Sequence, residues 1–310
     1  MGKILVVGSS NTDLIAKVKA FPGAGETIIG RSFLQSMGGK GANQAVAAHK
    51  LGGDVKFVTC LGKDPNGLNT MKYLSETGLD VSSSLLVEGV PSGTAIILVD
   101  DNGENCIVIT PGANNMLSPA YIREVKHDVD ACDMVVMQME IPVETVRTVC
   151  EMAVRQNKKV MLNVAPACRL DSGLMQLVDI LVVNETEAEV ISGEKIDEIG
   201  DAEMINRLLD MGAGSVVLTL GRKGCLMKNH HESHAVPAYR VKAVDSTGAG
   251  DTFCGALAAE LCRGNQWEDA LRFATAASAI CVTRMGAQPS IPTEHEVLEF
   301  LKSNLEPAHR

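Results

Sequence analysis

Aromatic residues are scarce in this chain, and an excess of positive charge is absent. Trp, Tyr and Phe make up 3% of the sequence, which is too few for a surface on which nucleic-acid bases stack. Acidic residues outnumber basic ones by 38 to 28, and the formal net charge is −10. Proteins that bind nucleic acids or anionic membranes through charge need clustered Lys and Arg. The composition therefore argues against both partners.

Long apolar runs, a signal peptide and paired cysteines are also missing from the sequence. No apolar run approaches the ~20 residues that cross a membrane, and Lys3 already begins a strand pattern where a signal peptide would have its apolar region. The nine cysteines contain no Cys-x-x-Cys pair, so nothing indicates a zinc ribbon or a dithiol redox motif. Most of them lie in apolar stretches, as is typical of reduced, buried thiols, and we expect a cytoplasmic protein.

Short apolar runs alternate with segments of helical periodicity along most of the chain. This alternation predicts an α/β fold, with a mostly parallel central sheet and helices on both faces. The 310 residues suffice for two domains or one large α/β unit, and we expect one unit over residues 1–310. The expected strands are Lys3–Val7, 55–60, 134–137, Lys159–Asn163, 179–183 and 215–220. The expected helices are 42–51, 66–77, 142–156, 202–211, Ala249–Cys262, 267–282 and 293–303.

Two excursions, residues 14–37 and 94–110, interrupt this alternation. The first has a Pro-Gly turn between two extended segments, and the second has Asn102-Gly103 between two apolar runs. Asn followed by Gly between alternating runs indicates a hairpin. We interpret the two excursions as a small separate β-sheet that forms a lid over one end of the main sheet. The alternative is two unrelated surface hairpins.

The most informative motif is Gly248-Ala249-Gly250-Asp251, which stands before a helix of small residues. Glycines let backbone N–H groups converge, and the N-terminus of a helix favours an anion such as a phosphate. A carboxylate repels a phosphate, so Asp251 needs a reason to be there. Deprotonating an attacking hydroxyl group is the natural one. The alternative is an acidic N-cap after a flexible turn.

A second glycine motif runs from Gly38 to Asn43 and also precedes a helix. It is not a Walker A loop, because Gly41 rather than Ser or Thr follows Lys40. We expect its backbone to come close to a polar small molecule, to which Asn43 donates a hydrogen bond. The alternative is a glycine hinge at the end of the lid, and the two interpretations are compatible.

Polar residues follow several of the predicted strands, whose carboxyl ends share one edge of the sheet. Asp13 lies after the first strand, where a dinucleotide-binding protein would have G-x-G-x-x-G, and could accept hydrogen bonds from a diol; a turn residue is the alternative. Glu140, residues 184–187 and residues 221–224 follow later strands. Together they suggest one shared crevice. The polar stretch with His230, His231 and His234 fits a solvated hairpin better than a metal site.

In these motifs and their order, the chain resembles the PfkB carbohydrate kinase family over nearly its whole length. The most specific motifs are residues 38–45 and Gly248–Asp251, and residues 8–13, 184–187, 219–224 and 286–290 support them. The resemblance implies the fold of that family and transfer of the γ-phosphoryl group of ATP to the 5-hydroxyl of D-ribose. The alternatives are a kinase for 2-deoxyribose or another sugar, and a non-catalytic sugar-binding regulator.

The resemblance also implies roles for individual residues. Asp251 would be the general base, and Gly248, Ala249 and Gly250 would form an anion hole. The sugar would be bound by Asn11, Thr12, Asp13, Gly39, Lys40, Gly41, Ala42, Asn43, Glu140 and Asp251. ATP would be bound by Asn184, Thr219, Leu220, Gly221, Arg222, Lys223, Gly224, Gly250, Asp251 and Thr275.

Two cations and a partner follow from the same resemblance. Mg²⁺ would be held through water by Glu187. A monovalent cation, K⁺, would lie beside the anion hole, and its ligands would be Asp245, Thr247, Cys281, Arg284, Gly286 and Ser290. Two copies would form a homodimer through their lids. Ser at position 246, where Thr is common in the family, and Cys at position 281, where a small apolar residue is more usual, remove no required group.

Overall fold

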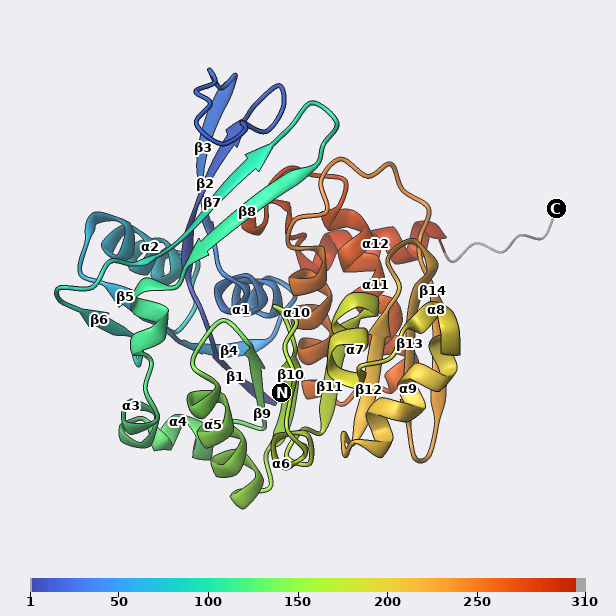
Figure 1. Ribbon diagram of the computed structural model, residues 1–310. Helices are drawn as coiled ribbons and strands as arrows, with labels where there is room; N and C mark the ends of the chain where they lie inside the picture. The colour runs from blue at the N-terminus through green and yellow to red at the C-terminus, as the bar shows by residue number, and fades with distance from the viewer. Residues whose placement is uncertain (1, 305–310) are drawn as a thin grey trace.

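A sheet of eight strands forms the centre of the computed structural model, which describes residues 2–304 (Figure 1). Its order is β14-β13-β12-β11-β10-β9-β1-β4. The strands from β12 to β4 are all parallel, and β13 and β14 add an antiparallel edge. The mostly parallel sheet expected from the sequence is therefore confirmed. The bounds are β1 Lys3–Val7, β4 Asp54–Val58, β9 Met134–Gln138, β10 Lys159–Asn163, β11 Ile180–Asn184, β12 Ser215–Thr219, β13 Gly224–Asn229 and β14 Ser233–Pro237.

Helices cover both faces of this sheet and bury a separate apolar cluster on each. Along β1, Leu5 and Val7 belong to one cluster, and Ile4 and Val6 to the other, because successive side chains of a strand point to opposite faces. One face carries α1 Lys40–Lys50, α2 Pro65–Glu76, α10 Ala249–Cys262, α11 Trp267–Cys281 and α12 Glu294–Asn304. The other carries α3 Pro119–Glu124, α4 Lys126–Ala131, α5 Val143–Arg155, α6 Ser172–Met175, α7 Glu185–Ser192, α8 Ile196–Ile199 and α9 Asp201–Asp210.

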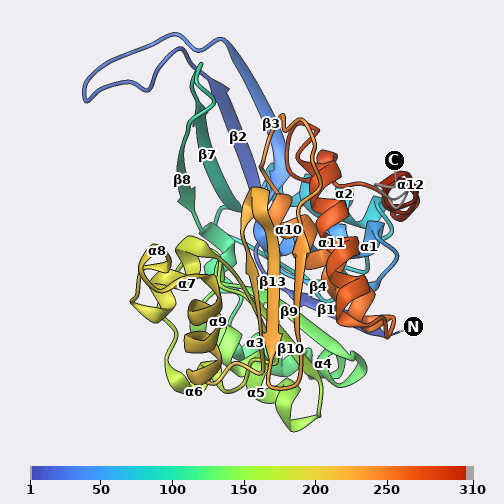
Figure 2. The same cartoon turned by 90° about the vertical axis from the view of Figure 1, so that its right-hand side faces the viewer.

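The two excursions pair with each other in a separate four-stranded sheet of order β3-β2-β7-β8. The first contributes β2 and β3, the second β7 and β8, and the parallel pair β2–β7 joins them. Figure 2 shows this sheet projecting away from the helices and the main sheet. The structure therefore confirms one shared lid sheet, and the alternative of two unrelated surface hairpins is excluded. The bounds are β2 Asn11–Lys17, β3 Ser32–Gly38, β7 Gly93–Val99 and β8 Asn105–Thr110.

The expected helices and strands are all present, and most of their ends shift by one or two residues. Residues 55–60 are the exception, because the run divides at Thr59 into β4 and the short strand β5 Cys60–Gly62, which pairs with β6 Leu85–Val87. Helices α3, α4, α6 and α8 were not expected, since one or two turns are too short to reveal a period. The 3₁₀ turns are η1 Gly112–Met116, η2 Gly221–Lys223 and η3 Gln288–Ser290.

Two further expectations concern the burial of the cysteines and the absence of a membrane-spanning helix. All nine cysteines are free, and each except Cys106 is buried or half-buried, which agrees with the expected buried thiols. Cys106 departs from the expectation because it lies on the exposed lid strand β8. Between residues 2 and 304, every helix is too short or too polar to cross a bilayer.

Candidate active site

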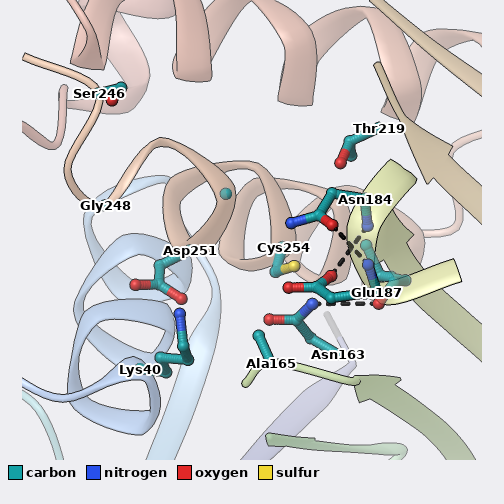
Figure 3. Close-up of a pocket in the computed structure, with 12 residues that line it drawn as sticks. Lys40, Asn163, Ala165, Asn184, Glu187, Thr219, Ser246, Gly248, Asp251 and Cys254 are labelled. Atoms are coloured by element: carbon teal, nitrogen blue, oxygen red, sulfur yellow. Dashed lines mark hydrogen bonds between the residues drawn. The ribbon is translucent and has the colours of Figure 1, made fainter. Parts of the chain in front are cut away.

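The carboxyl ends of β10, β11 and β12 meet the N-termini of α1 and α10 around a cavity of about 210 Å³ (Figure 3). Of the polar strand ends predicted to share a crevice, Asn184 and Glu187 line this cavity, and Glu140 does not. The residues that line it are Lys40, Asn163, Ala165, Val182, Asn184, Glu187, Thr219, Ser246, Gly248, Gly250, Asp251 and Cys254. A larger groove of about 1610 Å³ runs from Asp13 under the lid, past Asn184 and Thr219, to Thr275 on α11.

Asp251 lies in the first turn of α10 and is only 7% exposed. Gly248, the N-cap of this helix, has a φ of 75°, a left-handed conformation that favours glycine. At Gly250, no atom lies within 4 Å of the point where a Cβ would stand. The helix start is therefore open on that side, and its N–H groups favour an anion there. The geometry places a carboxylate beside a site suited to a phosphoryl group.

The sugar-binding residues expected from the sequence lie at the junction of lid and main sheet. Asp13 is 8% exposed on β2 and faces the groove. Glu140 uses Oε2 to accept hydrogen bonds from the Ser9 hydroxyl at 2.6 Å and the Lys40 backbone N–H at 3.0 Å. Asn11 Oδ1 accepts from Asn114 Nδ2 at 2.7 Å, which leaves the amide nitrogen of Asn11 as its free donor. The junction thus offers two carboxylates and one amide donor.

The glycines of the second motif serve close backbone approach, as expected, but the partner is part of the protein. A Cβ on Gly39 would stand 2.7 Å from Ser10 Cα, and one on Gly41 would stand 2.5 Å from Ser9 N. Helix α1 therefore starts in direct contact with the loop after β1. This contact brings Asn43 and Asp13 to one site.

The pKa of Asp13 is raised to about 7. Burial raises it most, the carboxylates of Glu140 and Asp251 raise it further, and the positive charge of Lys40 opposes them. An acid with a raised pKa keeps its proton in the folded state after the unfolded chain has lost it, so stability falls as pH rises between about 4 and 7. Asp13→Asn removes this penalty. Relative to wild type, the variant should gain about 2–3 kcal/mol in unfolding free energy from pH 5 to pH 8. Urea unfolding at both pH values measures it, and an equal difference at both would contradict the pKa.

Lys40 and Glu187 face each other across the cavity with Asp251 beside them (Figure 3). Burial alone would lower the pKa of Lys40, but the carboxylates of Asp251, Glu140 and Glu187 outweigh it and raise the pKa. Lys40 is therefore held as a cation within the cavity. Burial raises the pKa of Glu187, opposed by its hydrogen bond from the Asn184 backbone and by Lys40.

Asn184 and Glu187 form a capping box at the start of α7. The Glu187 N–H donates to Asn184 Oδ1, and the Asn184 N–H donates to Glu187 Oε2, each at 2.8 Å. The acidic helix start predicted after β11 therefore has a structural role as well. Both residues still line the cavity.

Asp245 joins the loop before α10 to the loop after α11. Its Oδ1 accepts from the backbone and hydroxyl of Thr247 at 2.9 and 2.7 Å, and its Oδ2 accepts from the Gly286 N–H at 2.8 Å. Burial acts to raise the pKa of Asp245, but these hydrogen bonds lower it below the ordinary value. Ser290 contacts Cys281 Sγ at 2.9 Å in the same region. Of the expected cation ligands, Thr247 and Gly286 thus contact the Asp245 carboxylate, and Cys281 and Ser290 contact each other.

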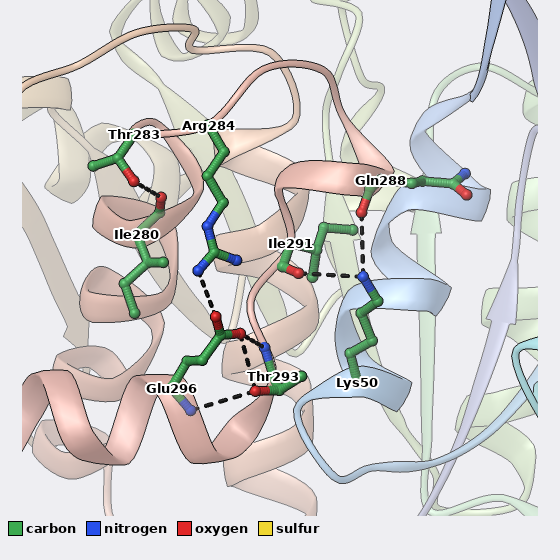
Figure 4. Close-up of polar contacts among 8 residues, drawn as sticks. All are labelled: Lys50, Ile280, Thr283, Arg284, Gln288, Ile291, Thr293 and Glu296. Atoms are coloured by element: carbon green, nitrogen blue, oxygen red, sulfur yellow. Dashed lines mark hydrogen bonds and ion pairs between the residues drawn. The ribbon is translucent and has the colours of Figure 1, made fainter.

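Two charged groups brace the segment 284–291 from outside (Figure 4). Lys50 Nζ donates to the carbonyls of Gln288 and Ile291 at 3.4 and 3.2 Å. Arg284 donates to Glu296 at 2.5 Å, and the Thr293 N–H donates to the same carboxylate at 2.7 Å. Together these two hydrogen bonds lower the pKa of Glu296 to about 2. Both contacts fix the chain that carries the expected cation ligands.

Some expected site residues lie apart from the cavity and the groove. Thr12 follows Asn11 on β2 and is buried, and its side chain does not line the groove. The imidazole of His234 contacts Glu232 beside the β13–β14 turn that holds His230 and His231, and residues 2–304 contain no cluster of three metal-ligating side chains. The other expected site residues that line neither space are Asn11, Gly39, Gly41, Ala42, Asn43, Glu140, Leu220, Lys223, Cys281, Arg284 and Ser290. Asn43, expected to donate to the small molecule, donates to Asp251 instead.

The structure adds polar residues that the sequence reasoning did not assign: Ser9, Gln44, Asn114, Gln138, Asn163 and Gln288. Three of them stand inside the motifs, at Ser9, Gln44 and Gln288. Asn163 ends β10 and lines the cavity, so the same strand-end argument that found Asn184 would have found it. Asn114 is brought to Asn11 only by the lid topology.

Comparison with known proteins identifies the family. A profile described as pfkB family carbohydrate kinase matches residues 1–294, and the chain belongs to that family. It is 39% identical over 300 residues to a ribokinase of Haemophilus influenzae, covering 96% of this chain and 98% of that protein. It is 38% identical over 303 residues to a deoxyribokinase of Salmonella typhi, covering 97% and 99%.

Solved structures of ribokinases share this fold. The Thermotoga maritima ribokinase has a TM-score of 0.90 at 39% identity, covering 97% of this chain and 100% of that one. The Arabidopsis thaliana ribokinase, complexed with ribose and ATP, has a TM-score of 0.90 at 31% identity, covering 97% and 99%. The family resemblance inferred from the motifs is confirmed.

Proposed function

We propose that this chain is an ATP-dependent kinase that converts D-ribose to D-ribose 5-phosphate. The observation that carries the proposal is the buried carboxylate of Asp251 beside the open helix start at Gly250. A base and an anion site in contact are what phosphoryl transfer to a hydroxyl requires. The relatives support the substrates, since one is named ribokinase and another is a ribokinase complexed with ribose and ATP.

In the proposed reaction, Asp251 accepts the proton of the 5-hydroxyl as the hydroxyl oxygen attacks the γ-phosphorus of ATP. The bond between the γ-phosphorus and the bridging oxygen breaks, and ADP leaves with the electron pair. The N–H groups at the start of α10 and the cation of Lys40 would stabilise the charge on the transferring group. Asp13 would hold the sugar under the lid, with Asn11 and Glu140 beside it at the junction of lid and main sheet.

The nucleotide would occupy the groove toward α11. Asn184, Thr219 and Thr275 line it, together with Gly221 and Gly224 on the β12–β13 connection. Mg²⁺ neutralises charge on the phosphates of ATP in kinases. Such an ion usually keeps several waters and binds the phosphates. Two carboxylates line the cavity, Asp251 and Glu187, and Glu187 is the one that would hold the ion through water.

Turnover is expected to rise when K⁺ replaces tetramethylammonium at fixed Mg²⁺ and ionic strength. The reason is that Asp245, held ionised beside Thr247 and Gly286, adjoins the loop that leads into the anion hole. A cation there would order the N–H groups of that loop. ADP release in the two salts measures the effect, and Asp245→Asn should lose it. Equal rates in both salts would exclude an active cation site.

The experiment that tests the function is ADP release with ATP and Mg²⁺ across D-ribose, 2-deoxyribose, fructose, adenosine and tagatose. Highest kcat/KM on ribose supports the proposal. Highest kcat/KM on 2-deoxyribose would favour the alternative suggested by the deoxyribokinase of Salmonella typhi. Sugar binding without ADP release would favour a non-catalytic regulator.

We also propose that two copies form a homodimer through their lids. Exposed apolar side chains lie on both faces of the lid sheet. Phe33 at 66%, Val108 at 58% and Ile96 at 49% exposed share the face away from the groove, and Leu34 and Ile107 line the groove. Exposed apolar side chains in such numbers suit a protein–protein contact. Sedimentation should give twice the chain mass, 32.9 kDa per copy.

Nine free thiols suit a reducing compartment such as the cytoplasm.

A further inference from the structure

Both carboxylate oxygens of Asp251 accept hydrogen bonds from side-chain amides of α1. Asn43 Nδ2 donates to Oδ2 at 2.9 Å, and Gln44 Nε2 donates to Oδ1 at 3.1 Å. A second amide fixes each of these: Gln138 Nε2 donates to Gln44 Oε1 at 2.7 Å, and Gln288 Nε2 donates to Asn43 Oδ1 at 3.2 Å. We call Asn43, Gln44, Gln138 and Gln288 the amide clasp.

The hydrogen bonds of the amide clasp all point toward the carboxylate. An ionised carboxylate can only accept, so Asn43 and Gln44 must present their nitrogens to it, and their oxygens must face outward. Gln138 and Gln288 must then present nitrogen to those oxygens. Their own Oε1 atoms are left over, and both are buried with no partner among residues 2–304.

Stability alone does not account for this arrangement. The four side chains are at most 5% exposed, and Gln44 and Gln138 are fully buried. Buried acceptors without partners cost free energy, whereas apolar side chains of similar size would leave none. The arrangement does have a consequence for Asp251, because it makes both neighbouring amides present their nitrogens to the carboxylate.

The clasp fixes the direction of the carboxylate. Gln44 Nε2 also donates to Asn163 Oδ1 at 3.0 Å, and Asn163 Nδ2 donates to the Val182 carbonyl at 3.0 Å, so the Gln44 amide is held on three sides. Amides do not titrate in the physiological range, so the clasp is the same at every working pH.

We propose that Gln44 and Gln138 are positioning residues for the phosphoryl transfer. Gln138 reaches no reacting group; it orients the Gln44 amide, and Gln44 holds the Asp251 carboxylate at the angle from which it meets the sugar hydroxyl. This inference rests on the proposed function, in which Asp251 is the base. It assigns an effect on the reaction rate to Gln138, which lies at the end of β9 and contacts Gln44 but not Asp251.

The test compares Gln44→Met, Gln138→Met and the double variant with wild type. A misplaced reacting group can cost up to about 10²-fold, so kcat should fall about 10–100-fold for Gln44→Met and about tenfold for Gln138→Met. The KM values for ribose and ATP should stay within about twofold, because the substrates are not touched. The double variant should be no slower than Gln44→Met, since Gln138 acts only through Gln44.

The division of the effect between kcat and KM separates positioning from packing. Losing the Gln44 donor should lower kcat while the KM values stay unchanged, because one of the two hydrogen bonds that hold the direction of the Asp251 carboxylate is lost. The control is Tyr121→Phe, which removes a hydrogen bond to the Ser83 carbonyl outside the site and should change melting temperature only.

Two results would overturn the proposal. The first is a wild-type kcat in Gln138→Met, and the second is additive losses of kcat that simply follow melting temperature. If Gln44→Met does not fold, Gln44→Glu keeps the shape, places a second carboxylate against Asp251, and should lose more activity at pH 8 than at pH 6. A wild-type chain that does not phosphorylate ribose would instead contradict the proposed function, so the two failures are distinguishable.

Discussion

Asp251→Asn is expected to lower kcat by about 10²–10⁴-fold, the usual contribution of positioned proton transfer, while ribose affinity changes by no more than a few-fold. The carboxylate is buried beside the open start of α10, where it has no cationic partner in contact and two amide donors. An amide at this position cannot accept the proton of the sugar hydroxyl. Single-turnover ADP release and calorimetric titration of ribose measure the two quantities separately.

A second substitution guards against a local rearrangement. The new amide group of Asp251→Asn would turn an N–H toward Asn43 or Gln44, so Asp251→Ala should be measured alongside it. Both variants should fold and bind ribose. Turnover near that of wild type in either folded variant would exclude Asp251 as the base.

Asp13→Ala is expected to lose most activity on ribose and to reduce the preference for ribose over 2-deoxyribose. Charge-assisted hydrogen bonds contribute about 1.5–3 kcal/mol each, and a site built to bind a hydroxyl penalises an analogue without it. Wild type should therefore prefer ribose in kcat/KM by more than about tenfold. Measurement of kcat/KM for both sugars shows how far the ribose-to-deoxyribose ratio falls from wild type to Asp13→Ala. The ATP affinity of Asp13→Ala without sugar should be nearly unchanged.

Asp128→Ala is a matched control for Asp13→Ala. Asp128 is also a buried carboxylate, 6% exposed, and it pairs with Lys56 at 2.7 Å away from the groove. Its loss should lower melting temperature and leave the sugar preference as it is. An unchanged ribose-to-deoxyribose ratio in Asp13→Ala would reject Asp13 as a sugar contact and leave it a structural residue of β2.

Most of the fold could be predicted because local patterns decide it. The strands Lys3–Val7 and Lys159–Asn163 and the helix Ala249–Cys262 have the expected bounds, since buried parallel strands are continuous apolar runs and the helix follows a glycine turn. The division at Thr59 was missed because both parts of the run are apolar and nothing in the composition marks the break.

The place of Asp251 at the cavity could also be predicted, but the amides that contact it could not. Asp251 stands in a motif whose spacing implies its chemistry. Gln138 is one polar residue at the end of an apolar strand, and only the pairing of β9 with β1 and the start of α1 brings it to Gln44. Which amides meet across elements far apart in the chain is a property of the packing, and one sequence does not contain that information in local form.

Strand β2 belongs at once to the sugar site and to the lid. Its first residues, Asn11 to Asp13, are buried at the site, and its last, to Lys17, reach out into the lid, where β7 runs parallel to it. A strand paired on both sides resists bending, so we expect a tilt of the lid to displace Asp13 as well. Under the proposed function, a movement of the lid would therefore also move the residues of β2 that bind the sugar.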